Sequence, residues 1–331
     1  KGTQVSTRIR LARNLEGYVF PSHLKTEHKA KEIIRRITVG LNRLDEFKLY
    51  YMSDIPEDTA SFLMENHLIS PALIKNRKYS AALINNEENL SIMINEEDHL
   101  REQCIVDGFN LKQAYETLSK IDGEIGKSIK FAYDEQFGYL TACPTNLGTG
   151  LRASVMLFLP ALTINGAMPK VINSISRLGL TVRGVYGEGS QAEGYTYQIS
   201  NEVTLGVTEE QILSEVEKVV NDITEIEARE RINILKGTNS LDVKDKCLRS
   251  YGVLTNCAKL TTDELVQFAA DVKLGACLGF INIPDVSVID DLVIKLRPGN
   301  INKAANAKLT PLERDTYRAE YAGKKFKQFT Q

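Results

Sequence analysis

The 331-residue chain has no tryptophan, only four histidines and no long hydrophobic run. Its longest nearly unbroken apolar stretch, residues 154–162, is too short to cross a bilayer. The five cysteines include no C-x-x-C pair, and the histidines lack a metal-ligand spacing, which argues against disulfides or a structural zinc and favours a reducing compartment. No secretory signal opens the sequence, although it begins at Lys1 rather than at methionine. We therefore expect a cytoplasmic protein without a structural metal.

The near-neutral net charge of −2 excludes a global field that would attract nucleic acid or an anionic membrane. An anion site would have to be built from individually placed arginines. The common nucleotide-binding motifs fail as well. The G-K-S of "DGEIGKS" (122–128) has Ile121 where a P-loop needs glycine, so we expect a surface turn there. The G-x-G-x-x-A at 187–192 is followed by a strand-like segment instead of a helix, which excludes a dinucleotide fold.

Length and pattern predict two domains. Residues 1–235 mix helical patterns with β-branched and aromatic runs. The expected strands are 47–53, 79–85, 90–94, 180–186 and 195–200, with 79–94 as a hairpin, and the expected helices are 27–44 and a long one after Thr208. Residues 236–331 show only helical patterns, in 261–275, 284–299 and 310–321. The sequence thus predicts an α+β domain with an antiparallel sheet, followed by a smaller all-α domain.

Four segments of the first domain combine charged residues with turns: "STRIRLAR" (6–13), "NEEDHLR" (95–101), "CPTNLGTGLRASV" (143–155) and "RGVYGEGSQAEG" (183–194). Each alone has an ordinary interpretation: a solvated edge strand, an acidic first turn of a helix, a small buried cysteine before a loop, and a hairpin turn. Their combination in one chain is what indicates chemistry.

Together, in matching order and spacing, these segments resemble the guanidino (phosphagen) kinases. "RDTYRA" (314–319) matches the R-D-x-x-R-A motif of the branch that phosphorylates arginine side chains of proteins. The resemblance implies a phosphagen-kinase-like catalytic domain over 1–235 and a helical dimerisation and phosphoarginine-binding domain over 236–331.

The resemblance assigns phosphate contacts to Arg8, Arg10, Arg101, Arg152 and Arg183. The charges fit, because ATP carries about four negative charges and fork-shaped, permanently charged arginines can hold three phosphates without a P-loop. Mg²⁺ would be held by the phosphates and water, with no protein metal site. The other ATP-binding residues implied by the family motifs are Ser6, Thr7, Ile9, His67, Ala153, Ser154, Val155, Met156, Gly184, Val185, Tyr186, Gly187 and Glu188.

The acceptor guanidinium is a poor nucleophile, because its pKa is above about 12. It must be held in line, its charge balanced and its proton removed. By resemblance Glu97 and Glu188 grip it, with Glu188 as the better candidate for the base, and Cys143 lies beside it as a positioning thiolate.

Metabolite-using family members carry a helical domain before "STR" and a histidine after the acidic-loop glutamate, where this chain has Gly189. Both differences favour an open pocket and a protein-borne arginine as acceptor. The family motif further implies an allosteric phosphoarginine site at Arg314, Asp315, Arg318 and Ala319, although taken alone this is a typical solvated stripe on a helix.

By resemblance the function is protein arginine phosphorylation that marks proteins for Clp-dependent degradation under stress. The implied partners are the CtsR repressor as a substrate, the activator McsA, the Clp machinery and a second copy of the chain. The alternatives are a kinase for a free small guanidine and an inactive adaptor with a kinase fold.

Overall fold

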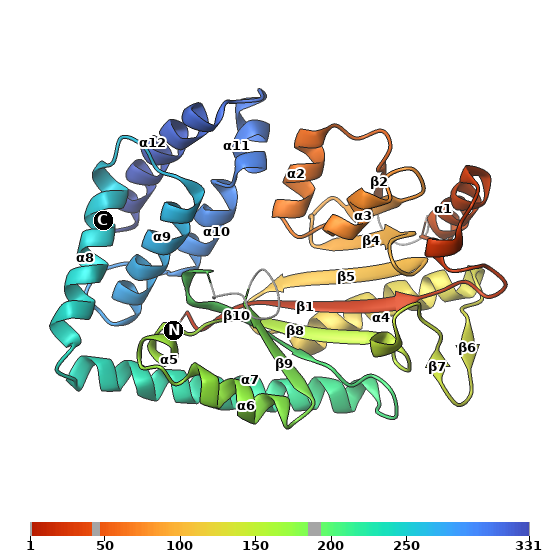
Figure 1. Cartoon of the computed structure of the whole chain (residues 1–331), viewed down its shortest axis with the longest axis horizontal. Coiled ribbons are helices and arrows are strands. Elements are labelled where there is room, and N and C mark those ends of the chain that lie inside the picture. The colour runs from red at the N-terminus through yellow and green to blue at the C-terminus, as the bar shows by residue number, and fades with distance from the viewer. Residues whose placement is uncertain (1, 42–46, 185–192, 331) are drawn as a thin grey trace.

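The computed structural model describes residues 2–41, 47–184 and 193–330, and the first domain is built on one antiparallel sheet (Figure 1). In these residues the sheet has eight strands, in the spatial order β2-β3-β4-β5-β1-β8-β10-β9. Their bounds, in chain order, are β1 (Gln4–Arg13), β2 (Phe47–Tyr51), β3 (Ala81–Asn85), β4 (Leu90–Ile94), β5 (Leu100–Asp107), β8 (Leu151–Phe158), β9 (Leu180–Gly184) and β10 (Thr196–Asn201). The expected α+β class and the 79–94 hairpin, formed by β3 and β4, are confirmed.

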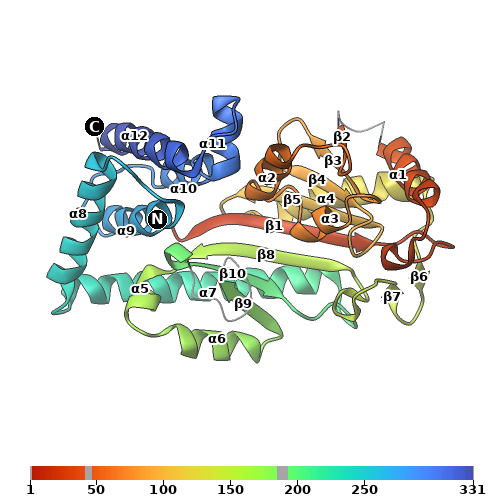
Figure 2. The ribbon, with the colours of Figure 1, turned by 45° about the horizontal axis from the view of Figure 1, so that its top comes forward.

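One face of the sheet carries the core. Ile9, Leu11 and Val155 point to this face and are fully or almost fully buried. They pack with the helices α1 (Glu27–Leu41), α4 (Leu111–Ser128) and α7 (Glu209–Lys236), of which α7 runs beneath the sheet toward the second domain (Figure 2). The N-terminus of α7 has the expected capping box between Thr208 and Gln211.

The surface turn expected at 122–128 is wrong, because this segment is the end of α4. Ile121 and Ile125 lie on the buried stripe of that helix, and their burial outweighs the low helix propensity of two glycines. The remaining short elements of the first domain are η1 (Pro21–His23), β6 (Tyr133–Asp134), β7 (Gly138–Tyr139), η2 (Pro144–Asn146), α5 (Pro160–Ile164), α6 (Met168–Ser176) and η3 (Glu193–Tyr195).

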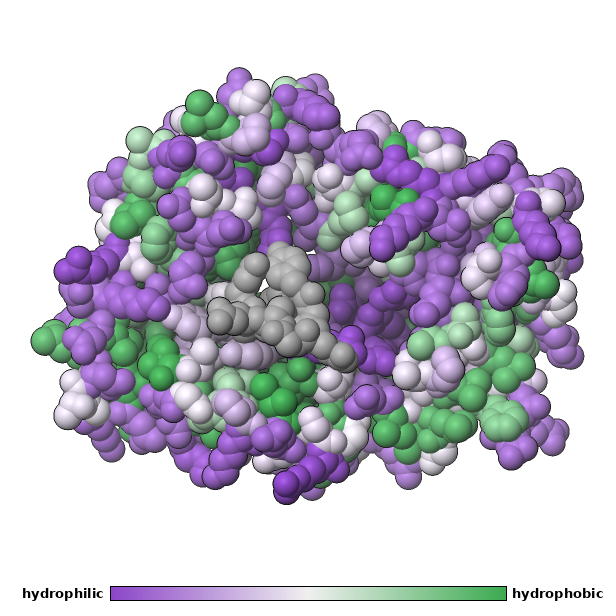
Figure 3. Space-filling view, in the orientation of Figure 1, coloured by the Kyte–Doolittle hydropathy of each residue, from purple (hydrophilic) through white to green (hydrophobic). Residues whose placement is uncertain are grey.

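Among the described residues, the elements that cover the other face of the sheet lie at its two ends. At one end, α2 (Glu57–Glu65) and α3 (Pro71–Lys75) pack on Ala82 and Met93 of β3 and β4. At the other end stands the helical domain. Figure 3 shows a hollow between them whose visible walls are mainly hydrophilic. The candidate site lies on this face of the sheet, between those two ends.

The helical domain has its own hydrophobic core, to which Phe158 and Ala161 of the first domain also contribute. Its helices are α8 (Ser240–Asn256), α9 (Thr262–Cys277), α10 (Ser287–Lys295), α11 (Pro298–Ala305) and α12 (Pro311–Phe329). Capping boxes at Thr261 and Thr310 start α9 and α12. Pro298, expected to end a helix, instead begins α11, since proline fits the first helical turn. No helix in the described ranges is long and apolar enough to span a membrane.

Candidate active site

The strand register places the five predicted phosphate-binding arginines on one face of the sheet, opposite the core. Arg10 of β1 lies opposite Arg152 of β8 and opposite Gln103 of β5. Arg101 is two residues from Gln103 along β5, and Arg8 is two residues from Arg10 along β1. Arg183 of β9 is placed by strand pairing: it lies opposite Gln198 of β10, and Gln198 lies opposite Met156 of β8. Residues directly opposite or two apart share a face, so all five guanidiniums emerge on one side.

These arginines form a concentrated positive cluster. Burial and the charges of Arg8, Arg101 and Arg152 lower the pKa of Arg10 well below its ordinary value, while Glu96 opposes the shift. Burial and Arg101 likewise lower the pKa of Arg8 to about 10. Among the described residues, the buried Nε of Arg10 has no hydrogen-bond partner. Mutually repelling cations and an unpaired buried donor are what a polyphosphate would satisfy, so the residues fit ATP.

Glu96, which the sequence analysis did not assign, braces this cluster. Its side chain is only 1% exposed and accepts hydrogen bonds from a guanidinium nitrogen of Arg101 and from the hydroxyl of Ser70. Ser70 in turn caps α3 by accepting from the backbone N–H of Leu73. The carboxylate thus fixes the position of the Arg101 guanidinium on the sheet face.

The next residues of "NEEDH" tie this segment to its neighbours. The buried carboxylate of Asp98 accepts from the backbone N–H of Ala142 at 2.7 Å and from Asn14 Nδ2 at 2.6 Å. The buried imidazole of His99 accepts from the backbone N–H of Leu15 at Nδ1 and donates from Nε2 to the carbonyl of Val19. Asp98 therefore holds the cysteine loop in place, and His99 holds the chain that follows β1.

Glu97 is the member of "NEEDH" that faces solvent. Burial and the neighbouring carboxylates Asp98 and Glu96 raise its pKa, while the charges of Arg101 and Arg152 act in the opposite direction. Its carboxylate therefore lies within electrostatic reach of the arginine cluster. A carboxylate with a raised pKa is a stronger proton acceptor, which suits a group that faces a guanidinium.

Cys143 lies at the start of η2, where its Sγ is 3.1 Å from Thr145 Oγ1. It lies close to Arg152, whose pKa is lowered by burial and by the charge of Arg183. The loop behind it needs glycine at position 148, where φ is +106° and a Cβ would come within 2.3 Å of the Thr204 carbonyl oxygen. This close contact presses the loop against the chain after β10 and so fixes where Cys143 lies.

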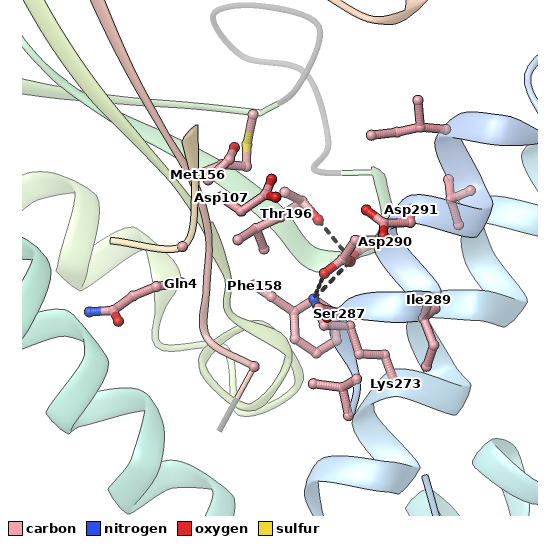
Figure 4. A pocket seen from close by; sticks show the side chains of 18 of the residues that line it. Gln4, Asp107, Met156, Phe158, Thr196, Lys273, Ser287, Ile289, Asp290 and Asp291 are labelled. Carbon is pink, nitrogen blue, oxygen red and sulfur yellow. Dashed lines mark hydrogen bonds and ion pairs between the residues drawn. The ribbon is translucent and has the colours of Figure 1, made fainter. Parts of the chain in front are cut away.

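A cavity of about 690 Å³ continues from the arginine cluster into the space between the two domains. Arg8, His67, Ser154 and Met156 line it from the first domain. In Figure 4, Lys273 of α9 and Asp290 of α10 form an ion pair on the helical side, near Phe158 of β8. The cavity therefore has walls from both domains, and Arg8 is the one member of the arginine cluster that lines it.

His67 lines this cavity in a left-handed backbone conformation, with φ of +59°. Its carbonyl accepts from Gln103 Nε2 at 2.6 Å, which fixes the unfavourable geometry. The residue keeps an exposed surface, but desolvation by the protein around it, together with the charges of Arg8 and Arg297, lowers the pKa of its imidazole to about 4. The imidazole is neutral at physiological pH and can donate or accept a hydrogen bond.

Because side chains alternate along a strand, some of the other predicted ATP-binding residues lie on the arginine face and some point into the core. Ser6, Ser154 and Met156 share the arginine face, and Gly184 ends β9 beside it. The side chains of Thr7, Ile9, Ala153 and Val155 point to the core, and all four are buried. Their contact with nucleotide stays a prediction. Val185, Tyr186, Gly187 and the predicted base Glu188 lie outside the described residues, as does Gly189.

Two glutamines were also missed, and both support the cluster. Gln103 holds His67, and the side-chain oxygen of Gln198 accepts from Arg8 at 2.6 Å. Gln103 could have been found from its spacing, because it lies two residues from Arg101 on the same strand. Gln198 could not, because it is brought to the cluster by pairing with Arg183 of another strand.

The predicted phosphoarginine site on α12 contains one half-buried and one buried arginine. Arg314 is half-buried and donates to the Leu309 carbonyl at 2.6 Å. Arg318 is 1% exposed and donates to the carbonyls of Leu296 and Leu260 and to Asp315. Ala319 is buried beside it. Arg318 is thus an internal tie between α12 and two loops, which is the opposite of a solvated stripe.

The chain belongs to the ATP:guanido phosphotransferase family. The family profile "ATP:guanido phosphotransferase, C-terminal catalytic domain" matches residues 29–230. Its solved structural neighbours include lombricine kinase, with a TM-score of 0.61 and 27% identity over 68% of this chain and 66% of the other. Another is the duplicated taurocyamine kinase of Schistosoma mansoni with transition-state-analogue components, with a TM-score of 0.63 and 28% identity over 80% of this chain and 38% of the other. The chain therefore spans less than two thirds of these two neighbours.

Within the family the chain is similar to the protein-arginine kinases. It is 43% identical to the protein-arginine kinase of Halothermothrix orenii over 96% of this chain and 90% of the relative. It is 42% identical to that of Caldanaerobacter subterraneus subsp. tengcongensis over 97% and 96% of the two chains. A second profile, "Protein-arginine kinase McsB C-terminal domain", matches residues 240–331, which are the helical domain.

Proposed function

We propose that this chain is a protein arginine kinase, which transfers the γ-phosphoryl group of ATP to arginine side chains of proteins. The observation that carries the proposal is the cluster of five arginines on one sheet face, with Glu97 and Cys143 at its edge. The near full-length similarity to protein-arginine kinases supports the same acceptor.

In this proposal Arg8, Arg10, Arg101, Arg152 and Arg183 bind the phosphates, and Mg²⁺ is carried by the phosphates and water. Described residues with carboxylate, imidazole or thiol groups do not cluster in a way that would hold a metal ion. Phosphoryl transfer depends mainly on positioning and on stabilising negative charge, which fixed guanidiniums supply. Glu97 balances the charge of the acceptor guanidinium, Cys143 helps to orient it, and Glu188 takes its proton.

The finer assignments rest on the resemblance. They are cytoplasmic action in a stress response, self-association as a dimer or larger oligomer, regulation by McsA, CtsR as a substrate, and delivery of products to the Clp machinery. The predicted phosphoarginine site belongs with them. Arg314 and Asp315 are its more accessible members, because Arg318 already donates three hydrogen bonds within the domain.

The test compares two acceptors. The full chain is incubated with Mg-ATP and either free arginine or a folded protein rich in surface arginine, and acid-labile phosphate on arginine is measured by mass spectrometry. We expect transfer to the protein, and we expect Glu97→Gln to abolish most of it. Glu225→Gln removes an exposed carboxylate from α7 on the far face of the sheet and is the matched control.

Transfer to free arginine alone would establish the alternative of a small-guanidine kinase. Binding of nucleotide without transfer to either acceptor would establish the inactive adaptor. For the second site, Arg314→Glu should remove the response of activity to added phosphoarginine while leaving the affinity for ATP unchanged. An unchanged response would refute that site.

A further inference from the structure

The helical domain reaches the nucleotide cavity at the start of α11. Arg297 is the residue before this helix, and it lines the cavity together with Arg8 and His67. Arg8 belongs to the catalytic sheet, whereas Arg297 comes from the other domain. Arg297 also contributes to the lowered pKa of His67, so the two side chains lie within electrostatic range.

Glu65, at the end of α2, binds the N-terminus of α11 across the domain boundary. Its carboxylate oxygens accept the backbone N–H groups of Gly299 at 2.8 Å and Asn300 at 2.9 Å, and the Asn300 side chain donates to it at 3.0 Å. Such a carboxylate satisfies N–H groups that have no partner within the helix and interacts favourably with the helix dipole. The side chain of Asn66 adds a bond to the Asn300 side chain at 3.2 Å.

The contact is too close to admit a side chain at position 299. A Cβ on Gly299 would lie 2.7 Å from the backbone nitrogen of Phe62 and 2.9 Å from Glu65 Oε2. The two helix ends are therefore in direct backbone contact. His67 follows Glu65 by two residues and Arg297 precedes Gly299 by two, so this contact brings the backbone of both cavity-lining residues together.

We propose that Arg297 is a nucleotide-binding residue supplied by the helical domain, and that Glu65 is the positioning residue that holds it in the cavity. The guanidinium adds a sixth positive group to the phosphate-binding cluster, from the side that the sheet cannot reach. This inference rests on the proposed function in one respect, that the cavity takes ATP. It makes nucleotide affinity depend on the docking of the helical domain onto α2.

The test measures binding of Mg-ADP to the full chain by isothermal titration calorimetry, which needs no acceptor. We expect Arg297→Gln to weaken binding by about tenfold to a hundredfold, the range for losing a charged hydrogen bond. Arg297→Lys keeps the positive charge but loses the fork-shaped guanidinium, so its affinity for Mg-ADP should lie between those of the unsubstituted chain and Arg297→Gln. Lys295→Gln removes an exposed charge two residues away that does not line the cavity, and should change binding by less than about twofold.

Glu65 is tested by its kinetics. Glu65→Gln should raise the KM for ATP several-fold with kcat maintained, and the double variant with Arg297→Gln should bind Mg-ADP no more weakly than Arg297→Gln alone. Thermal unfolding without nucleotide checks that each variant folds. If Arg297→Gln does not fold, the affinity of Arg297→Lys for Mg-ADP decides whether Arg297 binds the nucleotide.

Three results would overturn the proposal in distinguishable ways. Binding by Arg297→Gln as tight as by Lys295→Gln removes Arg297 from the site but leaves the kinase function intact. Additive losses in the double variant remove the positioning role of Glu65. Failure of the unsubstituted chain to bind Mg-ADP removes the proposed function itself.

Discussion

Acid should destabilise the fold through His99, and the size of the effect can be worked out. The imidazole is fully buried, and burial lowers its pKa to about 4 from an ordinary value of 6.5, although the bond to Val19 opposes the shift. Protonation would also remove the lone pair at Nδ1 that accepts the backbone N–H of Leu15. The folded state therefore resists a proton that the unfolded chain accepts.

The sign follows from linkage. Between pH 6.5 and pH 4 the unfolded chain binds more protons at this site, so stability falls as the pH falls. For pKa values of 6.5 and about 4, the loss is about 2 kcal/mol at pH 5 and about 3 kcal/mol at pH 4. Below pH 4 both states are protonated and the loss no longer grows.

The assay is urea unfolding at a series of pH values for the unsubstituted chain and for His99→Gln, which does not titrate. Groups common to both cancel in the difference between their free energies of unfolding. We expect that difference to shrink by about 3 kcal/mol from pH 7 to pH 4. A difference that stays constant across this range would refute the reasoning.

Three further substitutions test the site and its supports. Glu96→Gln removes the negative partner of Arg101 and should raise the KM for ATP by about tenfold in initial-rate measurements; an unchanged KM would contradict the bracing role. Gly148→Ala should lower the free energy of unfolding by more than the about 1–3 kcal/mol that backbone strain alone costs, because the added Cβ would also clash with the Thr204 carbonyl. The control is Gly206→Ala: this glycine also has a positive φ, but the space around it is open, so the substitution should cost the strain alone. Arg318→Ala leaves two buried carbonyls without their donor and should destabilise the chain by about 3–5 kcal/mol in denaturant unfolding; a loss below about 1 kcal/mol would show that this guanidinium does not tie α12 down.

Local pattern predicted the elements better than it predicted their neighbours. The hairpin at 79–94 and the helix after Thr208 were predicted because hydrophobic alternation, helical periodicity and capping depend on residues that are close together in the sequence. The pairing of Arg10 with Arg152 could not be found in that way, because it joins strands far apart in the chain. The end of α4 was missed for the related reason that tertiary burial decided the conformation of a glycine-containing segment.

The same limit applies to the site. Resemblance supplied Glu97, but the adjacent Glu96 was left without a role, since "NEEDH" has no regular period that would tell which acid points inward. The spacing of Arg314 and Arg318 predicted a shared helix face, and taken alone it is typical of a solvated stripe. That Arg318 is buried follows only from its hydrogen bonds to the Leu260 and Leu296 carbonyls. Contacts between domains, such as that of Glu65 with α11, cannot be predicted from the local sequence, because they join residues far apart in the chain.

The central position of β1 has a consequence for how the protein is made. This strand leaves the ribosome before the other strands, yet its two neighbours are β5 and β8, and a wall of the nucleotide cavity waits for α9 and α10. Pairings between such distant segments form slowly, because the chain between them must first be ordered. The five arginines of a nascent chain can therefore come together only after the chain has been translated through β9, and the cavity gains its second wall only after α10.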